Sequence, residues 1–259
     1  MNLAGTVVWV TGGSSGIGAA LAAELSRRGA RVAITARRSE KLAEVAVRAP
    51  GNLLALPGDV RDRDAMLAVA GRVEADLGPI DLAVLNAGTW EQLDVAHWDS
   101  GPIRDHVETN LLGMVNCLDA ILPAMIARRS GTVIGVASVA GYRGYTRAEA
   151  YSTTKAAAIN LLESLRIDLD RLGVNVQVVN PGFVRTELTE RNDFPMPFMI
   201  EADDAARRIA DAIEKEKAEA VFPLPYRIGM KLVRYAPVRP YTAVSRWFAR
   251  RNVQGTHSA

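Results

Sequence analysis

A tyrosine and a lysine four residues apart, Tyr151 and Lys155, form the spacing in this chain that most directly suggests chemistry. Residues at i and i+4 share one face of a helix, so the two side chains are expected to lie side by side. A tyrosine hydroxyl has an ordinary pKa of about 10 and is a poor acid or base at neutral pH. Lowering that pKa to about 7 requires roughly 4 kcal/mol, and a neighbouring ammonium group is a plausible source of much of it. The pattern predicts an acid/base tyrosine, although a helix can also carry both residue types by chance.

The segment Thr-Gly-Gly-Ser-Ser-Gly-Ile-Gly, residues 11–18, follows a β-branched run and opens a helical pattern. A glycine-rich turn lets a pyrophosphate approach the backbone, and the N-terminus of the helix supplies free N–H groups and a positive dipole. Gly12, Gly16 and Gly18 would allow the tight turn, the close approach and the close packing of helix on strand. The spacing differs from the fingerprint G-x-G-x-x-G, and any tight strand-to-helix turn can use glycines. We predict dinucleotide contacts from Gly12, Ser14, Ser15, Gly16, Ile17 and Gly18.

Two arginines, Arg37 and Arg38, stand at the end of the second predicted strand. A dinucleotide site usually has Asp or Glu there, about 20 residues after the glycines, to bind the ribose 2′-hydroxyl. Residues 33–39 contain no acid, and a guanidinium can bind a 2′-phosphate through paired hydrogen bonds. The sequence therefore favours NADP(H) over NAD(H), the alternative being two solvated charges at a strand end.

Strand and helix patterns alternate along most of the chain. Short β-branched runs are followed by longer segments with helical spacing, such as the one that carries Ile17, Leu21 and Leu25. Such alternation implies right-handed βαβ units, and we predict an α/β fold: a Rossmann-type doubly wound parallel sheet of about seven strands with helices on both faces. The expected strands are residues 6–10, 31–36, 53–56, 81–85, 132–137 and 175–179, and the expected helices are residues 17–28, 40–47, 62–77, 104–127 and 150–172.

The composition of the 259-residue chain limits the classes of function. With 49% hydrophobic and 23% charged residues, the chain has enough apolar surface for a sizeable core and too little charge for a disordered protein. A net charge of +2 and the lack of a nucleic-acid motif argue against a nucleic-acid partner. The first ten residues have no basic n-region, so no signal peptide is expected, and the apolar residues 111–127 are interpreted as a helix buried against protein.

Cysteine and histidine usage points away from a metal site. The one cysteine, Cys117, excludes a disulfide framework and a cysteine zinc site, and it fits a reducing, cytoplasmic compartment. It is expected in the core rather than as a nucleophile. The histidines His97, His106 and His257 lack ligand spacing and are expected to have structural or surface roles, so no metal is predicted.

Several short motifs together resemble those of the short-chain dehydrogenase/reductase family, in its single-domain form of about 250 residues. They occur in the family's order within about residues 3–222: the glycine turn at 11–18, Asp59-Val60, Asn86-Ala87-Gly88, Asn110, Ser138, Tyr151 with Lys155, and Pro181-Gly182 followed by Thr186. Each motif alone is weak, whereas their joint occurrence is very specific. Gly13, where the family commonly has Ala, and Leu85, where a second Asn is frequent, depart from the pattern without removing a required group.

The resemblance implies a role for each motif. Ser138 would hydrogen-bond the substrate oxygen, Tyr151 would be the acid/base, and Lys155 would bind the nicotinamide ribose and lower the pKa of Tyr151. Asn110 would hold a helix kink and a water that extends a proton path from Lys155. The further cofactor contacts implied are Asp59 to the adenine amino group, Val60 beside the ring, Asn86, Ala87 and Gly88 at the end of the fourth strand, Pro181, Gly182 and Val184 in the turn after the last large strand, and Thr186 to the carboxamide.

The implied activity is hydride transfer between a nicotinamide and a carbonyl or alcohol, and three variable regions, 89–100, 139–150 and 185–200, are expected to line the substrate pocket. The apolar, proline-interrupted run 194–200 is interpreted as a lid over an apolar substrate, or alternatively as a loop packed on the tail or on another subunit. Arg143 and Arg147 are expected to be solvated; the alternative is that they contact an anionic end of the substrate.

We expect an NADP-dependent reductase of a ketone or aldehyde. The alternatives are an NAD-preferring alcohol dehydrogenase and a cofactor-binding regulator without turnover.

The C-terminal segment differs in charge from the rest, because Glu219 is the last acidic residue and seven Lys or Arg residues follow it. We divide the chain into a short-chain dehydrogenase/reductase domain, 1–225, and a basic amphipathic extension, 226–259. Pro225, Pro237 and Pro240 are expected to divide the extension into helical pieces too short to span a bilayer. One piece carries the apolar stripe Ile228, Leu232 and Tyr235, and the other carries Val244, Trp247 and Phe248. The extension either lies peripherally in a membrane interface or packs over the cleft or a subunit interface with its arginines in water.

The two longest predicted helices are more apolar than one face against the sheet requires. The residues concerned are Leu111, Leu112, Val115, Leu118, Ile121 and Leu122. Members of the family commonly pair these helices across a two-fold axis. A homodimer or homotetramer built on residues 104–128 and 150–172 is therefore expected.

Overall fold

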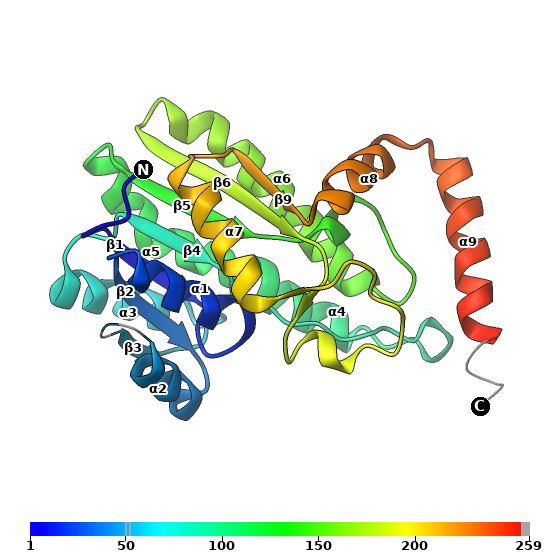
Figure 1. Cartoon of the computed structure of the whole chain (residues 1–259), viewed down its shortest axis with the longest axis horizontal. Helices are drawn as coiled ribbons and strands as arrows, with labels where there is room; N and C mark the ends of the chain where they lie inside the picture. The colour runs from blue at the N-terminus through cyan, green and yellow to red at the C-terminus, as the bar shows by residue number, and fades with distance from the viewer. Residues whose placement is uncertain (50, 52, 255–259) are drawn as a thin grey trace.

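The computed structural model describes residues 1–49, 51 and 53–254, and within them the centre is a seven-stranded sheet of order β3-β2-β1-β4-β5-β6-β9 (Figure 1). Each strand is parallel to its neighbours. The strands are β1 (Val7–Thr11), β2 (Arg31–Ala36), β3 (Leu54–Pro57), β4 (Leu82–Leu85), β5 (Gly131–Val136), β6 (Val174–Pro181) and β9 (Glu219–Phe222). The predicted fold class is confirmed, and of these seven strands only the edge strand β9 was not among the expected ranges. The short strands β7 (Val184–Arg185) and β8 (Ile200–Glu201), which pair with each other in a second sheet, were not expected either.

Helices cover both faces of the sheet, as a doubly wound fold requires. One face carries α1 (Gly16–Arg27), α2 (Ser39–Arg48) and α7 (Ala202–Glu214), and Leu21 and Ile209 are fully buried there. The other face carries α3 (Arg63–Leu77), α5 (Gly113–Ala127) and α6 (Glu149–Asp170), with Met66 and Leu162 in its core. A strand that is buried on both faces appears in the sequence as a continuous apolar run. This explains the composition of β1, every residue of which is buried.

The helix expected at residues 104–127 is present, but it begins at Gly101 and is not regular throughout. It consists of α4 (Gly101–His106), a π-helical segment η2 (Val107–Leu112) and α5. The side chain of Asn110, within η2, accepts from the N–H of Thr89 at 2.7 Å and donates to the Thr89 carbonyl and to Thr154 Oγ1 at 3.1 Å each. These bonds turn the helix toward the end of β4, and a π-helical turn accommodates the irregularity.

By length and composition, Gly101–Ala127 is the one stretch within the described residues that is apolar enough to cross a membrane. Here its α5 part packs on the sheet, with Cys117, Leu118 and Ile121 in the core. Burial raises the pKa of the Cys117 thiol to about 12. Of the six apolar residues expected at a subunit interface, Leu118 and Ile121 are buried and only Leu112 is well exposed.

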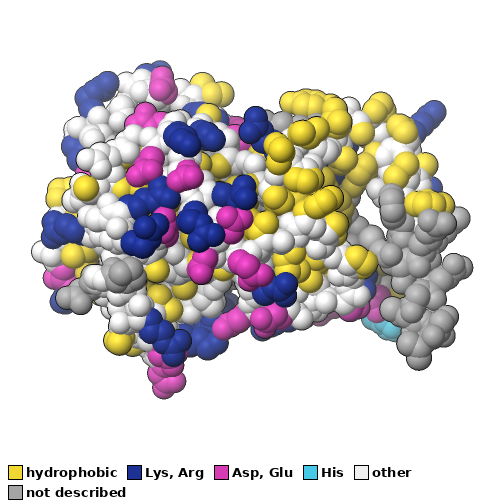
Figure 2. Space-filling view, viewed as in Figure 1, with side chains coloured by type: hydrophobic (Ala, Val, Ile, Leu, Met, Phe, Trp, Pro, Cys, Tyr) yellow, Lys and Arg dark blue, Asp and Glu magenta, His cyan; other side chains and the backbone are white. Residues whose placement is uncertain are grey.

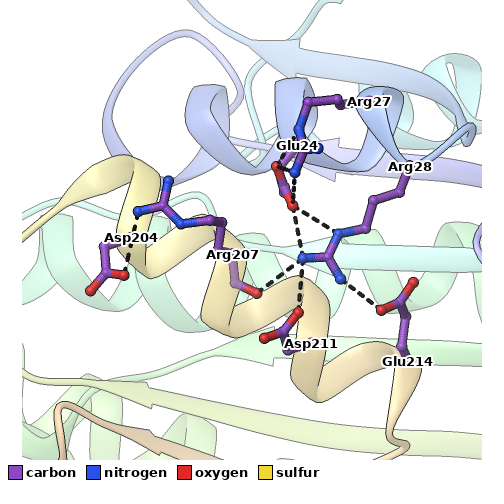
Figure 3. A network of polar contacts seen from close by, with 7 residues as sticks. All are labelled: Glu24, Arg27, Arg28, Asp204, Arg207, Asp211 and Glu214. Atoms are coloured by element: carbon purple, nitrogen blue, oxygen red, sulfur yellow. Dashed lines mark hydrogen bonds and ion pairs between the residues drawn. The ribbon is translucent and has the colours of Figure 1, made fainter.

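A network of charges fixes α1 against α7 (Figure 3). The carboxylate of Glu24, almost fully buried, accepts hydrogen bonds from Arg27 and Arg28. Arg28 also bonds Asp211 at 2.8 Å and Glu214 at 2.6 Å on α7. Burial alone would raise the pKa of Glu24, but the two arginines hold it below its ordinary value. Because α1 begins at the glycine turn, this network also positions that turn.

The C-terminal segment forms two helices, α8 (Leu224–Tyr235) and α9 (Val238–Gln254). Pro240 was expected to divide the segment but lies in the first turn of α9, where a proline needs no helical N–H partner. Helix α8 begins before the predicted boundary at residue 225, and its Tyr226 and Met230 pack on the core. The side chains of Lys231, Phe248, Arg250 and Arg251, and all of His257, lie outside the described part of the structure.

Candidate active site

A cleft of about 480 Å³ lies at the carboxyl ends of the central strands, where the strand order reverses between β1 and β4. Ligands of open α/β sheets bind at such a point. Of the residues predicted for the site, those that line this cleft are Gly12, Ser14, Ser15, Gly16, Ile17, Arg37, Arg38, Asp59, Val60, Asn86, Ala87, Gly88, Ser138, Tyr151, Lys155, Pro181, Gly182, Val184 and Thr186. Gly18 and Asn110, which were also predicted for the site, do not line the cleft.

The glycine turn has the geometry that a closely approached backbone requires. Gly12 and Gly16 have φ angles of +69° and +54°, in the left-handed region that favours glycine. A Cβ on Gly18 would lie 2.2 Å from the Gly12 carbonyl oxygen and 2.5 Å from Asn86 Nδ2. Asn86 in turn donates to the carbonyls of Thr11 and Gly12, at 3.1 and 3.3 Å. Gly18 therefore permits the close packing of α1 on the turn rather than contact with a ligand.

Ser138, Tyr151 and Lys155 meet at the inner end of the cleft. Ser138 follows β5, and its Oγ accepts from the N–H of Ala140 at 3.1 Å. Tyr151 and Lys155 come from the first turns of α6, and Lys155 Nζ lies 5.6 Å from the centre of the Tyr151 ring. Lys155 is almost fully buried, and its Nζ donates to the Val136 carbonyl at 2.9 Å. The ammonium thus lies below the phenol ring and is held by the end of β5.

The ionisation of this pair differs from the expectation that Lys155 lowers the pKa of Tyr151. Burial raises the pKa of Tyr151 to about 12, and the hydrogen bond with Ser138 lowers it only in part. Burial also lowers the pKa of Lys155 to about 8. The Lys155 ammonium donates to the Val136 carbonyl rather than to the phenol oxygen, and desolvation is the dominant effect on the pKa of Tyr151. Tyr151 is consequently protonated at neutral pH and is able to donate a proton.

Two aromatic side chains that were not predicted at the site contact the Tyr151 ring. Trp90 makes an edge contact with it at 5.2 Å between centroids, and His106 makes one at 6.4 Å. The N–H of Glu91 donates to His106 Nε2, so Nδ1 carries the proton and donates to the Pro102 carbonyl at 2.6 Å. His106 therefore has the predicted structural role, but beside Tyr151. No spacing in the sequence links these residues to Tyr151.

Charged residues line the outer end of the cleft. Arg38 binds Glu187 at 2.8 Å and Ser15 Oγ at 2.9 Å, and Lys41 binds the other oxygen of Glu187 at 2.6 Å. Hydrogen bonds from Lys41 and Arg38 lower the pKa of Glu187 to about 2. Glu187 and Lys41 were not predicted. Other unpredicted lining residues are Thr35, Ala36, Gly58, Thr89, Thr109, Val136, Ala137, Leu188, Thr189 and Arg191.

Asp59 and Arg37 lie beside this charged edge. The Asp59 carboxylate accepts from the side chain of Arg61 at 2.7 and 2.9 Å. Burial raises the pKa of Asp59, but the hydrogen bonds from Arg61 and the charge of Arg37 hold it below its ordinary value. This edge of the cleft thus carries two acids, Asp59 and Glu187, each paired with cations.

The predicted lid, residues 194–200, packs on α8, which was the alternative left open. Tyr226 of α8 donates to the Pro197 carbonyl at 2.9 Å, and its ring contacts Phe183 and Phe198 at 6.1 Å each. Arg143 was expected in solvent, but it donates to the carbonyls of Val233 and Ala236 at the C-terminus of α8, where unpaired carbonyls attract a cation. Arg147 is paired with Asp193 at 3.2 Å.

Comparison with known proteins agrees with this geometry. Residues 6–194 match a family model described as short chain dehydrogenase. An uncharacterized oxidoreductase of Myxococcus xanthus strain DK1622 is 37% identical over 92% of this chain and 95% of its own length. A 3-oxoacyl-acyl-carrier-protein reductase of Staphylococcus aureus strain Mu50 is 34% identical over 70% of this chain and 75% of its own length. A short-chain dehydrogenase/reductase of Burkholderia phymatum, solved in complex with NAD, has a TM-score of 0.82 at 21% identity, covers 90% of this chain and 94% of its own, and supports the fold alone.

Proposed function

The chain belongs to the short-chain dehydrogenase/reductase family and is an NAD(P)-dependent oxidoreductase, and we propose that it reduces a carbonyl on an apolar substrate with NADPH. The observation that carries this proposal is the meeting of Ser138, Tyr151 and Lys155 in the same cleft as the glycine turn. One end of the cleft offers proton donors, and the other offers a backbone cradle with cations. A hydride-transfer enzyme needs both ends within one cavity.

The residues of the cleft fit a dinucleotide. A Cβ on Gly12 would lie 2.8 Å from Ala87 Cα, and a Cβ on Gly16 would lie 2.9 Å from Thr186 Cγ2. The two glycines therefore leave space at the base of the cleft that a side chain would fill. The start of α1 directs free N–H groups and a positive dipole into this space, which suits a pyrophosphate. Val60, Asn86, Ala87 and Gly88 would border the adenosine and its ribose. Pro181, Gly182, Val184 and Thr186 would hold the carboxamide end.

Cations at the outer end support NADP(H) over NAD(H). Arg37, Arg38 and Lys41 follow β2, whose end is the usual place of the ribose-binding acid. Glu187 does not replace that acid, because it binds Arg38 and Lys41. A 2′-phosphate would find at least two guanidinium groups within this edge. The alternative is a preference for NAD and for alcohol oxidation, and the assay below distinguishes the two.

The chain's own residues supply orientation and the proton. When bound, the nicotinamide supplies or accepts the hydride. Ser138 and Tyr151 donate hydrogen bonds to one substrate oxygen, where negative charge develops during reduction, so donors fixed there stabilise the transition state most. Tyr151 then gives its proton to that oxygen. Lys155 would bind the nicotinamide ribose and support the proton donor by its charge, while Asn110 holds η2 against Thr89, which follows β4.

Aromatic side chains lie next to residues that line the Tyr151 end of the cleft. Trp90 packs on Tyr151, and Phe183, which lies between the lining residues Gly182 and Val184, contacts Phe194 of the predicted lid at 6.0 Å between ring centroids. Such a pocket favours an apolar molecule whose only polar group is the reacting carbonyl. We also propose a homodimer or homotetramer through α4–α5 and α6, where Leu112 and Ile167 are exposed.

A two-way steady-state assay tests the proposal. Purified protein is offered aliphatic and aromatic ketones and aldehydes with NADPH or NADH, and the matching alcohols with NADP⁺ or NAD⁺. We expect the highest kcat/KM for an apolar carbonyl with NADPH. Higher kcat/KM for NADH, or turnover confined to alcohols at neutral pH, would support the alternative.

A further inference from the structure

Helix α8 has two apolar faces, and only one of them is used by the fold. Tyr226 and Met230 pack on the core, and Tyr145 Oη lies 3.4 Å from Met230 Sδ. Leu224, Ile228, Leu232 and Tyr235 recur at i, i+4, i+8 and i+11 and so form one stripe on the opposite side. These four side chains are 59–81% exposed. A surface helix of a globular protein ordinarily presents polar residues there, so the outer stripe needs a separate explanation.

Helix α9 carries further exposed apolar residues. Val238, Val244 and Trp247 are exposed by about half or more. The first turn of α9 is tied to the body, because Tyr241 donates to the Gly144 carbonyl at 2.6 Å and Arg143 lies 5.1 Å from the centre of the Tyr241 ring. We call the seven residues Leu224, Ile228, Leu232, Tyr235, Val238, Val244 and Trp247 the outer tail surface. Figure 2 shows hydrophobic side chains gathered over α8 and the segment before α7, which includes the exposed Phe198.

The charge carried by α8 and α9 themselves has a single sign. After Glu219 the sequence contains seven Lys or Arg residues and no acid. Arg227, Arg239 and Arg246 are exposed beside the apolar side chains. Arg234 is excluded from this set, since it is paired with Glu163 of α6 at 3.2 Å. An occupant of this surface must therefore offer both apolar contact and negative charge.

We propose that the outer tail surface docks on an anionic lipid bilayer, with its apolar side chains in the interfacial layer and its arginines among the headgroups. An amphipathic helix with a basic flank and aromatic residues lies in such an interface. Helix α8, with 12 residues, is too short to cross a bilayer, and α9, with four arginines among its 17 residues, is too charged to do so. A second copy of the chain fits poorly. A two-fold contact would bring the basic surface against itself, and the centres of protein interfaces are depleted of charge.

Vesicle co-sedimentation tests the proposal. The full-length protein is mixed with vesicles of phosphatidylcholine alone or of phosphatidylcholine with phosphatidylglycerol. Since each basic residue near an anionic surface strengthens binding about fivefold, we expect at least tenfold tighter binding to the anionic vesicles at low salt. Raising the salt should weaken binding, because the Debye length falls from about 10 Å at 0.1 M to about 3 Å at 1 M. Brominated lipid should quench a fluorescence component that the Trp247→Phe variant lacks.

A pair of substitutions to glutamate distinguishes docking through the outer tail surface from non-specific adsorption to vesicles. The double variant Ile228→Glu, Leu232→Glu places two carboxylates within the outer tail surface, and it should lose at least tenfold in binding to anionic vesicles. The matched control, Val47→Glu with Leu67→Glu, alters two exposed apolar residues on α2 and α3, outside both the outer tail surface and the proposed subunit interface, and should bind as the wild type does. Titration with NADPH and thermal melting report whether each variant is folded.

Three results would overturn the proposal: no preference for anionic vesicles at low salt, unchanged binding by the Ile228→Glu, Leu232→Glu variant, or a lipid-free dimer that only this variant dissociates in sedimentation velocity. The last result would assign the surface to a second copy of the chain. Docking does not depend on which cofactor or carbonyl the cleft takes, so the vesicle experiment can fail while the reductase assignment stands.

Discussion

Arg38 and Glu187, 149 residues apart in the sequence, form an ion pair at 2.8 Å across the outer end of the cleft. Lys41 binds the same carboxylate, so Glu187 holds both cations at the place proposed for the 2′-phosphate. Because a phosphate and this carboxylate would compete for the same hydrogen-bond donors, Glu187 is expected to lower the affinity for NADPH.

Replacing Glu187 with Gln should tighten NADPH binding by roughly 3- to 10-fold and change NADH binding less, since hydrogen bonds to charged groups contribute about 1.5–3 kcal/mol and this pair is exposed. Fluorescence titration with both cofactors measures the effect. The pKa of Glu187 is about 2, so its carboxylate is ionised at every pH from about 5 to about 9 and the effect should be constant over that range. Glu190→Gln, in the same loop, is the control. Equal changes for NADPH and NADH would contradict competition at the 2′-phosphate.

Replacing Arg37 with Ala should reduce the preference for NADPH over NADH by about 10- to 100-fold, because a charge-assisted hydrogen bond to the phosphate is lost. Dissociation constants for the two cofactors give the ratio. Arg48→Ala, an exposed arginine at the end of α2, should leave it unchanged. An unaltered ratio in Arg37→Ala would leave the 2′-phosphate without its proposed partner.

Replacing Tyr151 with Phe should lower kcat by at least about 100-fold and change the NADPH dissociation constant by no more than about twofold, because the hydroxyl is the proton donor and the ring remains. Steady-state reduction and a cofactor titration separate the two effects. Tyr235→Phe removes an exposed hydroxyl and should behave as the wild type does. Half the wild-type turnover in Tyr151→Phe would refute the assignment.

The affinity for NADPH should fall as the pH rises above about 8. The pKa of Lys155 is lowered to about 8 by burial, so its ammonium is charged below that pH and loses its charge above it, together with its attraction for the cofactor. The NADPH dissociation constant, measured from about pH 6 to about pH 10, should show this rise in the wild type. In Lys155→Met the binding should be weaker and independent of pH across this range. A flat wild-type profile would mean that the lysine charge does not contribute to binding.

Replacing Gly18 with Ala should destabilise the protein by about 1–3 kcal/mol and weaken cofactor binding, because the added Cβ would lie 2.2 Å from the Gly12 carbonyl oxygen and forces α1 away from the turn. Thermal melting and NADPH titration measure the two losses. Gly71→Ala is the matched control: nothing lies within 4 Å of its Cβ, and the exchange on α3 should be neutral or stabilising by about 0.5–1 kcal/mol. An unchanged melting temperature in Gly18→Ala would show that the turn can accommodate the added Cβ without loss of stability, and it would contradict this prediction.

The sequence by itself determined the sheet and most of the cleft. Strands buried on both faces are apolar runs whatever they pack against, so β1, β2 and β5 were recognisable within one residue of their ends. Residues at the carboxyl ends of parallel strands must share one edge, which is why nearly all the predicted site residues line one cleft. The edge strand β9 was missed because it is short and begins with Glu219.

Only the tertiary structure decided what surrounds those residues. The contact of Trp90 and His106 with Tyr151, the ion pair of Arg38 with Glu187 and the network between α1 and α7 join segments far apart in the chain. The raised pKa of Tyr151 has the same origin, because desolvation depends on every neighbour that excludes water and not on the lysine four residues away. Helix periodicity likewise placed Ile228, Leu232 and Tyr235 on one stripe, but only the packing of Tyr226 and Met230 on the core decided that this stripe faces outward.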